Sequence, residues 1–301
     1  MKDDKKIFLK KLKNIQDIPS LPVIVMKVNQ MLDDYNTTND SLARVIEKDQ
    51  AIVFKMLLLV NSAFFGLREK VSTVKDASVI LGFDAIRNII ISLSVFETLS
   101  KISQKKSNEL FNVDDFWKHS IAVAVLSKYL SEKIGIGDPE KCFVNGLLHD
   151  IGKLIMAYYL KDDFKALMLK AREEKVIFIA AEKKVLPVNH CEIGYMISKK
   201  WGLPDVISNT IYHHHRIRAG CPAWDESIIV NSADGYANSF IQDSLNRTTS
   251  SGRMIYEYFD PNSKKRMKLL LESSQEWFFD VLKLINDANS FFFNMAQDKK
   301  I

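Results

Sequence analysis

Apolar residues that recur every three to four positions constrain the fold of this chain more than any other feature. Ile86, Ile89, Leu93 and Phe96, for example, fall on one face of a helix. The same spacing returns in most segments, and no series of alternating apolar and polar residues indicates a sheet. Only the short apolar run at 176–179 leaves helix and strand open. The pattern predicts an all-α fold.

Length and composition suggest how the helices are grouped. The chain has 301 residues, of which 47% are hydrophobic and 26% charged, with 11 Gly and 7 Pro, as is typical of a globular, helix-rich protein. Polar stretches at 100–108 and 243–253 mark two boundaries. We therefore expect an N-terminal helical bundle over 1–105, packed on a second helical domain over 106–242. A polar linker with C-terminal helices would occupy 243–301.

Charge and hydropathy exclude several functional classes. The 42 Lys and Arg against 37 Asp and Glu give a net charge of +5, and the basic residues are scattered, so nucleic-acid binding is not expected. The longest apolar run, 51–60, contains Lys55 and falls short of the ~18 residues that a membrane span needs. The first residues contain no apolar signal core. We expect a cytoplasmic protein that does not bind membranes.

The three cysteines do not form a recognisable motif. Cys142, Cys191 and Cys221 lie far apart without CxxC spacing, so neither a disulfide framework nor a zinc ribbon is indicated. Cysteine is among the most frequently buried residue types, which favours buried structural thiols over redox-active ones.

The histidines are confined to one half of the chain, between residues 119 and 215. A single histidine is more often a hydrogen-bonded core or surface residue than a ligand. Six together, with Asp150 and Asp234 as oxygen donors, make a complete mixed nitrogen and oxygen ligand set. The six are His119, His149, His190, His213, His214 and His215.

The segment around His149 poses the sharpest question, because His149, Asp150 and Lys153 directly follow an apolar run. Burying ionisable groups is costly unless each has a partner. That partner is a metal, a ligand, or another member of the group. Lys153 lies one helical turn beyond the other two and can face the same cavity, where it would neutralise a phosphate. The alternative is a helix-surface ion pair between Lys153 and Asp150.

These residues resemble a known ligand order. His119, the pair His149-Asp150 and Asp234 are similar to the H…HD…D pattern of the HD metal-dependent phosphohydrolase superfamily. His190 and the doublet His214-His215 resemble the additional ligands of its two-metal HD-GYP branch. The resemblance implies one or two divalent ions (Fe, Mn, Zn, Ni or Mg) and seven ligands: His119, His149, Asp150, His190, His214, His215 and Asp234. Adjacent helical residues point about 100° apart, so at most one or two of His213, His214 and His215 can face inward. The resemblance favours His214 and His215 and leaves His213 outside.

The remaining motifs resemble a narrower family, HDOD, the HD-related output domain of bacterial signalling proteins. The similarity runs from about residue 15 to about 240. It implies that 106–242 is an HD-like helical domain, and that the chain has protein partners in a signalling pathway and a small-molecule or nucleotide ligand. The motifs are 18–22 (IPSLP), 45–49 (VIEKD), 58–63 (LLVNSA), 77–82 (ASVILG) and 200–204 (KWGLP).

The chain departs from the catalytic branch beside the histidine doublet. Arg216 stands where HD-GYP enzymes carry a glutamate, and no Gly-Tyr-Pro follows. HDOD members have usually lost several ligands and act as non-catalytic output modules, whereas this chain keeps them. We therefore expect a non-catalytic or weakly catalytic regulatory protein with a metal-binding HD-like site.

Two alternatives stay open. In the first, the chain is a metal-dependent phosphohydrolase or phosphodiesterase that acts on a nucleotide or phosphoester. Two ions roughly 3.5–4 Å apart would then act on the water and on the leaving oxygen, with Asp150 and Lys153 as catalytic residues. In the second, the chain is a metal-free helical interaction module whose histidines only form hydrogen bonds.

Overall fold

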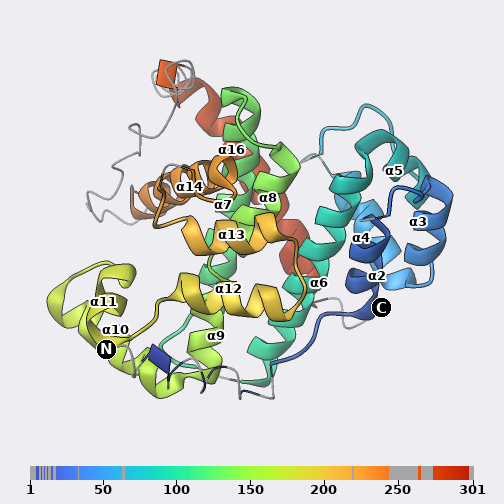
Figure 1. Ribbon diagram of the computed structural model, residues 1–301. Coiled ribbons are helices and arrows are strands. Elements are labelled where there is room, and N and C mark those ends of the chain that lie inside the picture. The colour runs from blue at the N-terminus through green and yellow to red at the C-terminus, as the bar shows by residue number, and fades with distance from the viewer. Residues whose placement is uncertain are drawn as a thin grey trace.

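Figure 1 shows the computed structural model of the chain. The structure describes residues 18–243 and 274–297, except 33, 63–64, 107 and 219, together with a few positions before residue 18 and residues 264–265. Throughout these residues the secondary structure is helical and contains no β-strand, which confirms the predicted all-α class. The greater part of the proposed linker, 244–253, lies outside the described residues.

The first helices form a compact group on the right of Figure 1, and a long helix, α6, runs beside them. A sharp turn at Gly82, which has φ +82°, separates α5 from α6. That backbone conformation suits glycine because it has no Cβ. The helices are α2 (Val23–Leu32), α3 (Asn39–Ile46), α4 (Gln50–Val60), α5 (Val74–Leu81) and α6 (Phe83–Lys105).

The later helices surround α7, whose side chains are buried on almost every face. The apolar run at 176–179 resolves as helix at its second half, since α11 begins at Phe178. These helices are α7 (Val113–Ile134), α8 (Pro139–Leu148), α9 (Ile151–Tyr159), α10 (Lys161–Glu174), α11 (Phe178–Val185), α12 (His190–Lys200), α13 (Asp205–His213), α14 (Trp224–Asp243) and α16 (Ser274–Gln297).

Local sequence explains where many of these helices begin. The side chains of Thr38, Asp49, Thr73 and Asn112 each accept a hydrogen bond from a backbone N–H in the first turn of the helix that follows. Such caps satisfy amide groups that would otherwise lack a partner, and each contributes about 1 kcal/mol. At its other end, α7 terminates at Gly135, which adopts the left-handed conformation.

The two groups of helices share one hydrophobic core. Helices α2, α4 and α5 pack on α6, which in turn contacts α8 and α9. Helix α7 packs against both α8 and α14. The boundaries at residues 105 and 242 stay predictions.

None of the described helices is by itself long and apolar enough to cross a membrane. Helices α5 and α6 meet the requirement of length and composition only as a pair, and that pair is bent by 120°.

Helix α16 returns across the molecule and packs on α7. One of its faces is buried: Trp277, Val281, Ile285, Ala288 and Phe292. The ring of Phe292 lies 4.9 Å from the ring of Phe96 on α6, and Trp277 lies 5.3 Å from Tyr129 on α7. The last described helix is therefore part of the core.

We predict that Phe292→Ala lowers the free energy of unfolding by about 3–5 kcal/mol, because it leaves a cavity between α6 and α16. Phe279→Ala is the matched control, since Phe279 is on the same helix but 72% exposed. It should change stability by no more than about 0.5 kcal/mol. Urea denaturation measures both, and equal losses would contradict the assigned packing of α16.

Candidate metal centre

The pair His149-Asp150 lies at a break between two helices. Helix α8 ends at Leu148 and α9 begins at Ile151. Asp150 has φ −104° and ψ +11°, outside the helical region, so the chain changes direction there. The break places both side chains at the centre of the surrounding helices, where His149 is fully buried and Asp150 is 1% exposed.

Glycine permits α12 to approach this break closely. A Cβ added at Gly152 would lie 1.9 Å from the carbonyl oxygen of His190, and one added at Gly194 would lie 2.7 Å from the side chain of Ile211. Gly152 cannot carry a larger side chain without moving α12, because its Cβ would meet backbone atoms, and a Cβ at Gly194 would displace the Ile211 side chain. The two glycines thus bring the first turn of α12 against the first turn of α9.

A capping box fixes the start of α12. The side chain of Asn189 accepts from the backbone N–H of Glu192, whose carboxylate accepts from the N–H of Asn189. His190 and Cys191 are the first two residues of the helix, and both are buried.

The other donors come from three more helices. His119 lies on α7 and Asp234 on α14, while His214 and His215 follow the last residue of α13. The structure therefore brings together seven side chains from distant parts of the chain. His213 does not join them, and its ring packs against Tyr212 instead.

One oxygen of Asp150 faces the first group of donors. Asp150 Oδ2 lies 3.2 Å from His149 Nε2 and 3.9 Å from His119 Nε2. Asp234 Oδ1 closes the group, at 3.1 Å from His119 Nε2 and 3.8 Å from His149 Nε2. His119, His149 and Asp150 present donor atoms within 4.8 Å of one another, which is close enough for one ion.

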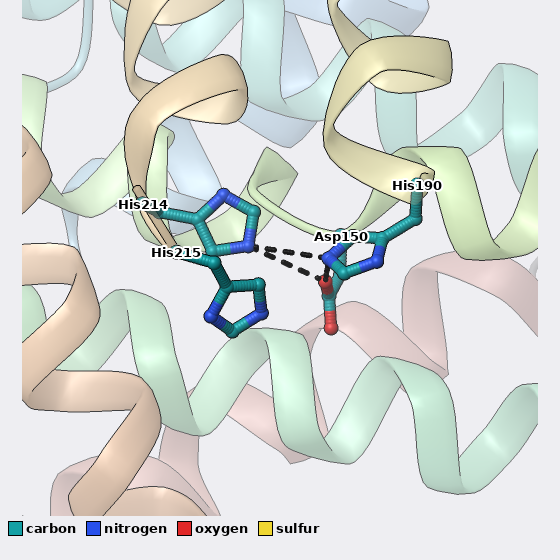
Figure 2. A group of neighbouring side chains, drawn as sticks. All are labelled: Asp150, His190, His214 and His215. Atoms are coloured by element: carbon teal, nitrogen blue, oxygen red, sulfur yellow. Dashed lines mark hydrogen bonds and ion pairs between the residues drawn. The ribbon is translucent and has the colours of Figure 1, made fainter. Parts of the chain in front are cut away.

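The other oxygen of Asp150 faces the second group. Asp150 Oδ1 lies 3.2 Å from His190 Nε2 and 3.7 Å from His214 Nε2. Figure 2 shows these imidazoles and His215 gathered around the carboxylate. Donor atoms of Asp150, His190, His214 and His215 also lie within 4.8 Å of one another. Asp150 is thus shared between two groups of donors.

Three of the imidazoles are held from behind through Nδ1. His149 Nδ1 lies 2.7 Å from the carbonyl oxygen of Gly146, and His214 Nδ1 lies 2.8 Å from that of Ile211. His190 Nδ1 lies 2.7 Å from a carboxylate oxygen of Glu182. Because these oxygens only accept, each Nδ1 carries the proton and donates. In the neutral rings the lone pair is then on Nε2, which points at Asp150.

The charge state of the centre follows from its burial. Burial lowers the pKa of His149 and keeps its ring neutral. Burial by itself raises the pKa of the Asp150 carboxyl, but His149 and Lys153 outweigh that effect and hold the pKa well below its ordinary value. Of these two, the Lys153 ammonium carries its charge at neutral pH, and it forms an ion pair with Asp150 Oδ2. Asp150 is therefore ionised inside the core.

Two polar atoms at the centre have no hydrogen-bond partner among the described residues: His149 Nε2 and Asp150 Oδ1. His149 Nε2 bears a lone pair, because its ring is neutral, and it faces carboxylate oxygens of Asp150 and Asp234 rather than an N–H or O–H group. Leaving such atoms unsatisfied inside a protein costs about 1–3 kcal/mol or more. A cation held by the donors of a group removes the cost there, so the residues present fit a divalent metal with mixed nitrogen and oxygen ligands.

Two residues near the centre were not assigned a role from the sequence. Glu182, on α11, is fully buried and accepts from both Nδ1 and the backbone N–H of His190. A carboxylate in this position orients an imidazole and increases its basicity. Only the fold reveals it, because Glu182 lies eight positions before His190 on a different helix.

Cys191 is the second residue near the centre to which the sequence assigned no role. Burial raises the pKa of its thiol, but His190 and His214 outweigh burial and lower the pKa to about 6. Burial lowers the pKa of His214, yet Cys191 and Asp150 raise it to about 9. The thiol and the imidazole thus favour the ionised forms of one another. Cys142, by contrast, is buried away from the imidazoles, and burial raises the pKa of its thiol.

A helical all-α chain with donors in the order H…HD…D around one buried carboxylate defines a protein of the HD type. The family model for the HDOD domain matches residues 18–217, and the chain belongs to the HDOD family.

Solved structures share the fold. One is an HDOD domain protein of unknown function from Geobacter sulfurreducens, 23% identical with a TM-score of 0.72, and the match covers 96% of this chain and 98% of that one. Another, from Shewanella amazonensis, is provisionally named a phosphohydrolase; it is 19% identical with a TM-score of 0.64, and the match covers 94% and 97%.

Among curated relatives, an uncharacterised protein of Treponema pallidum is 26% identical over 212 residues, which cover 67% of this chain and 38% of the relative. YuxH of Bacillus subtilis is 26% identical over 145 residues, which cover 44% of this chain and 34% of the relative. The chain thus spans less than two fifths of the length of these relatives.

We predict that Gly152→Ala separates α9 from α12 and lowers the free energy of unfolding by about 1–3 kcal/mol or more, because its Cβ would meet backbone atoms. Gly235→Ala is the control: it lies on α14 beside Asp234, and a Cβ there meets no atom within 4 Å. Thermal denaturation compares the two. Equal stability of Gly152→Ala and the wild type would contradict the close approach of the helices.

Proposed function

We propose that this chain is an output module of a signalling protein, and that its HD-like half binds one or two divalent metal ions through His119, His149, Asp150, His190, His214, His215 and Asp234. The metal would stabilise or switch the module rather than support turnover. Protein partners and a cytoplasmic location belong to the same proposal. Membership of the HDOD family and the preserved ligand set support it.

The observation that carries the proposal is the shared carboxylate. Asp150 directs one oxygen to His149 and the other to His190, each at 3.2 Å. The structure holds these groups in place through Gly146, Ile211 and Glu182. Ligands so positioned need little reorganisation when a divalent ion enters, and such an ion would supply the positive charge that the buried donors lack.

Limited access favours binding over turnover. His149, His190 and His214 are fully buried. Other side chains of the centre reach the surface: His119 is 15% exposed, Asp234 11% and Lys153 22%, and His215 is also partly exposed. An ion can pass such an opening more readily than a nucleotide can. Arg216, which is exposed, adds positive charge directly after the doublet.

Metal-dependent phosphoester hydrolysis is the second candidate. Two donor groups that share a carboxylate are the arrangement required for two ions acting on one phosphate. Lys153 supports this candidate as well, because its ammonium pairs with Asp150 and its side chain is 22% exposed, so it can neutralise an anionic substrate.

We predict that the wild-type protein binds Mn²⁺, Fe²⁺ or Zn²⁺ and gains stability on binding. Binding to the folded state alone adds about 2.7 kcal/mol when free metal exceeds Kd a hundredfold. Asp150→Asn should lose the bound metal and this gain, because it removes the charge shared by both donor groups. His213→Ala, outside the cluster, should keep both. Elemental analysis and thermal denaturation measure these effects, and a metal-free wild type after reconstitution would refute the proposal.

We predict little turnover of common phosphoesters and nucleotides by the reconstituted protein. The test is a phosphatase and phosphodiesterase screen with added Mn²⁺ or Fe²⁺, with Asp150→Asn as the blank. Robust metal-dependent hydrolysis that disappears in Asp150→Asn would make the hydrolase the better assignment.

A further inference from the structure

A groove of about 860 Å³ lies between α4 and α16, and none of the seven proposed metal ligands lines it. Its volume falls within the range of about 300–1,000 Å³ that is usual for small-molecule pockets. The walls are mainly apolar: α4 contributes Phe54, Leu57 and Leu58, and α16 contributes Phe291 and Met295. The groove is therefore a second concave site, built by the N-terminal group of helices and the last described helix.

Large apolar side chains stand in solvent along this groove. Phe54 is 59% exposed and Leu58 50%. The two lie four positions apart on α4 and so project from one side of it, and Phe291 and Met295 have the same spacing on α16. Exposed apolar side chains that are contiguous around a hollow mark a binding surface rather than scattered surface residues.

Polar lining residues gather at one end of the groove. Asn61 and Ser62 directly follow the last residue of α4. The Asn61 side chain donates to the carbonyl oxygen of Val71 at 2.7 Å and accepts from the backbone N–H of Val71 at 2.7 Å. These two bonds hold Lys70, the preceding residue and another member of the lining, beside the end of α4.

The charge at the groove is positive. Among the residues that the structure describes, the charged side chains of the lining are Lys55 and Lys70. Lys55 Nζ lies 3.1 Å from a carboxylate oxygen of Glu97, which also pairs with Lys101 at 2.9 Å. Two ammonium groups thus share one carboxylate, and the exposed Lys70 adds a further positive charge. An anion is the complementary ligand.

We propose that the groove binds a linear alkyl carboxylate, with its hydrocarbon chain between α4 and α16 and its carboxylate beside Lys70. This second ligand site goes beyond the proposed function and does not rest on metal binding. Between Ala51 and Leu58 the helix rises about 10 Å, which sets the length of the chain. Apolar walls with one polar end suit such a molecule better than a partner helix, whose charges would flank its apolar stripe along the whole length.

The test is titration calorimetry of the full-length protein with decanoate. We expect one decanoate to bind per chain, and removal of metal with a chelator should leave the affinity unchanged. Decyltrimethylammonium has the same alkyl chain and the opposite charge, and it should bind at least about tenfold more weakly because like charges oppose it. Acetate has the carboxylate without the chain, and it should not compete with decanoate.

Two pairs of variants locate the ligand. Phe54→Asp should weaken decanoate binding by at least about tenfold, because it puts a charge in the apolar wall. Leu169→Asp is its matched control: Leu169 is 46% exposed on α10, on the opposite side of Figure 1 from α4. Lys70→Glu should weaken binding by about fivefold, whereas Lys165→Glu, at an exposed lysine of α10, should leave it unchanged.

Several results would overturn the proposal. The wild type would fail to bind decanoate, would bind decyltrimethylammonium equally well, or would keep its affinity in both Phe54→Asp and Lys70→Glu. A wild-type dimer that does not bind decanoate and that Phe54→Asp converts to a monomer would make the groove an interface between copies. Binding of a synthetic acidic amphipathic helix in place of decanoate would make it a protein-docking site. Metal content, measured separately, is independent of all these outcomes.

Discussion

A negative charge at the centre of the helical core is the constraint on which the rest of this half of the molecule depends. Asp150 is ionised at 1% exposure, and a lone buried carboxylate would be too costly to keep. The chain surrounds it with imidazoles whose Nδ1 atoms are fixed by oxygens behind them. Gly152 admits the helix that carries His190. The close packing of α9 and α12 is thus what places the imidazole of His190 beside the charge of Asp150.

The same centre explains why family resemblance alone does not decide between binding and turnover. A complete set of donors is a property of the catalytic HD branch, yet Arg216 and the missing Gly-Tyr-Pro are not. The structure adds that His149, His190 and His214 are fully buried, while His119, His215, Asp234 and Lys153 are partly exposed. The ligand set therefore favours catalysis, whereas the limited access favours binding of an ion. For a substrate as large as a nucleotide, access is the stronger restriction.

The sequence predicts the parts of this structure that depend on nearby residues. Helical spacing and caps such as Thr38 and Asp49 are local, so the all-α class could be read directly. The HD resemblance identified the side chains that the fold brings together. It did not reveal the helix break at Asp150, because the surrounding residues are compatible with a continuous helix. Nor did it reveal Glu182, whose role depends on how α11 meets α12. The spacing of residues within a helix does not predict which helices will contact one another.

Helix α6 gives the molecule a mechanical property. It has 23 residues without an internal glycine or proline, and so is about 34 Å long and stiff. Helices α2, α4 and α5 pack on it, and it also contacts α8 and α9, between which Asp150 lies. A force on the first helices must either break their packing on α6 or move α6 with them. The long helix therefore links the packing of the N-terminal helices to that of the helices that hold the buried carboxylate.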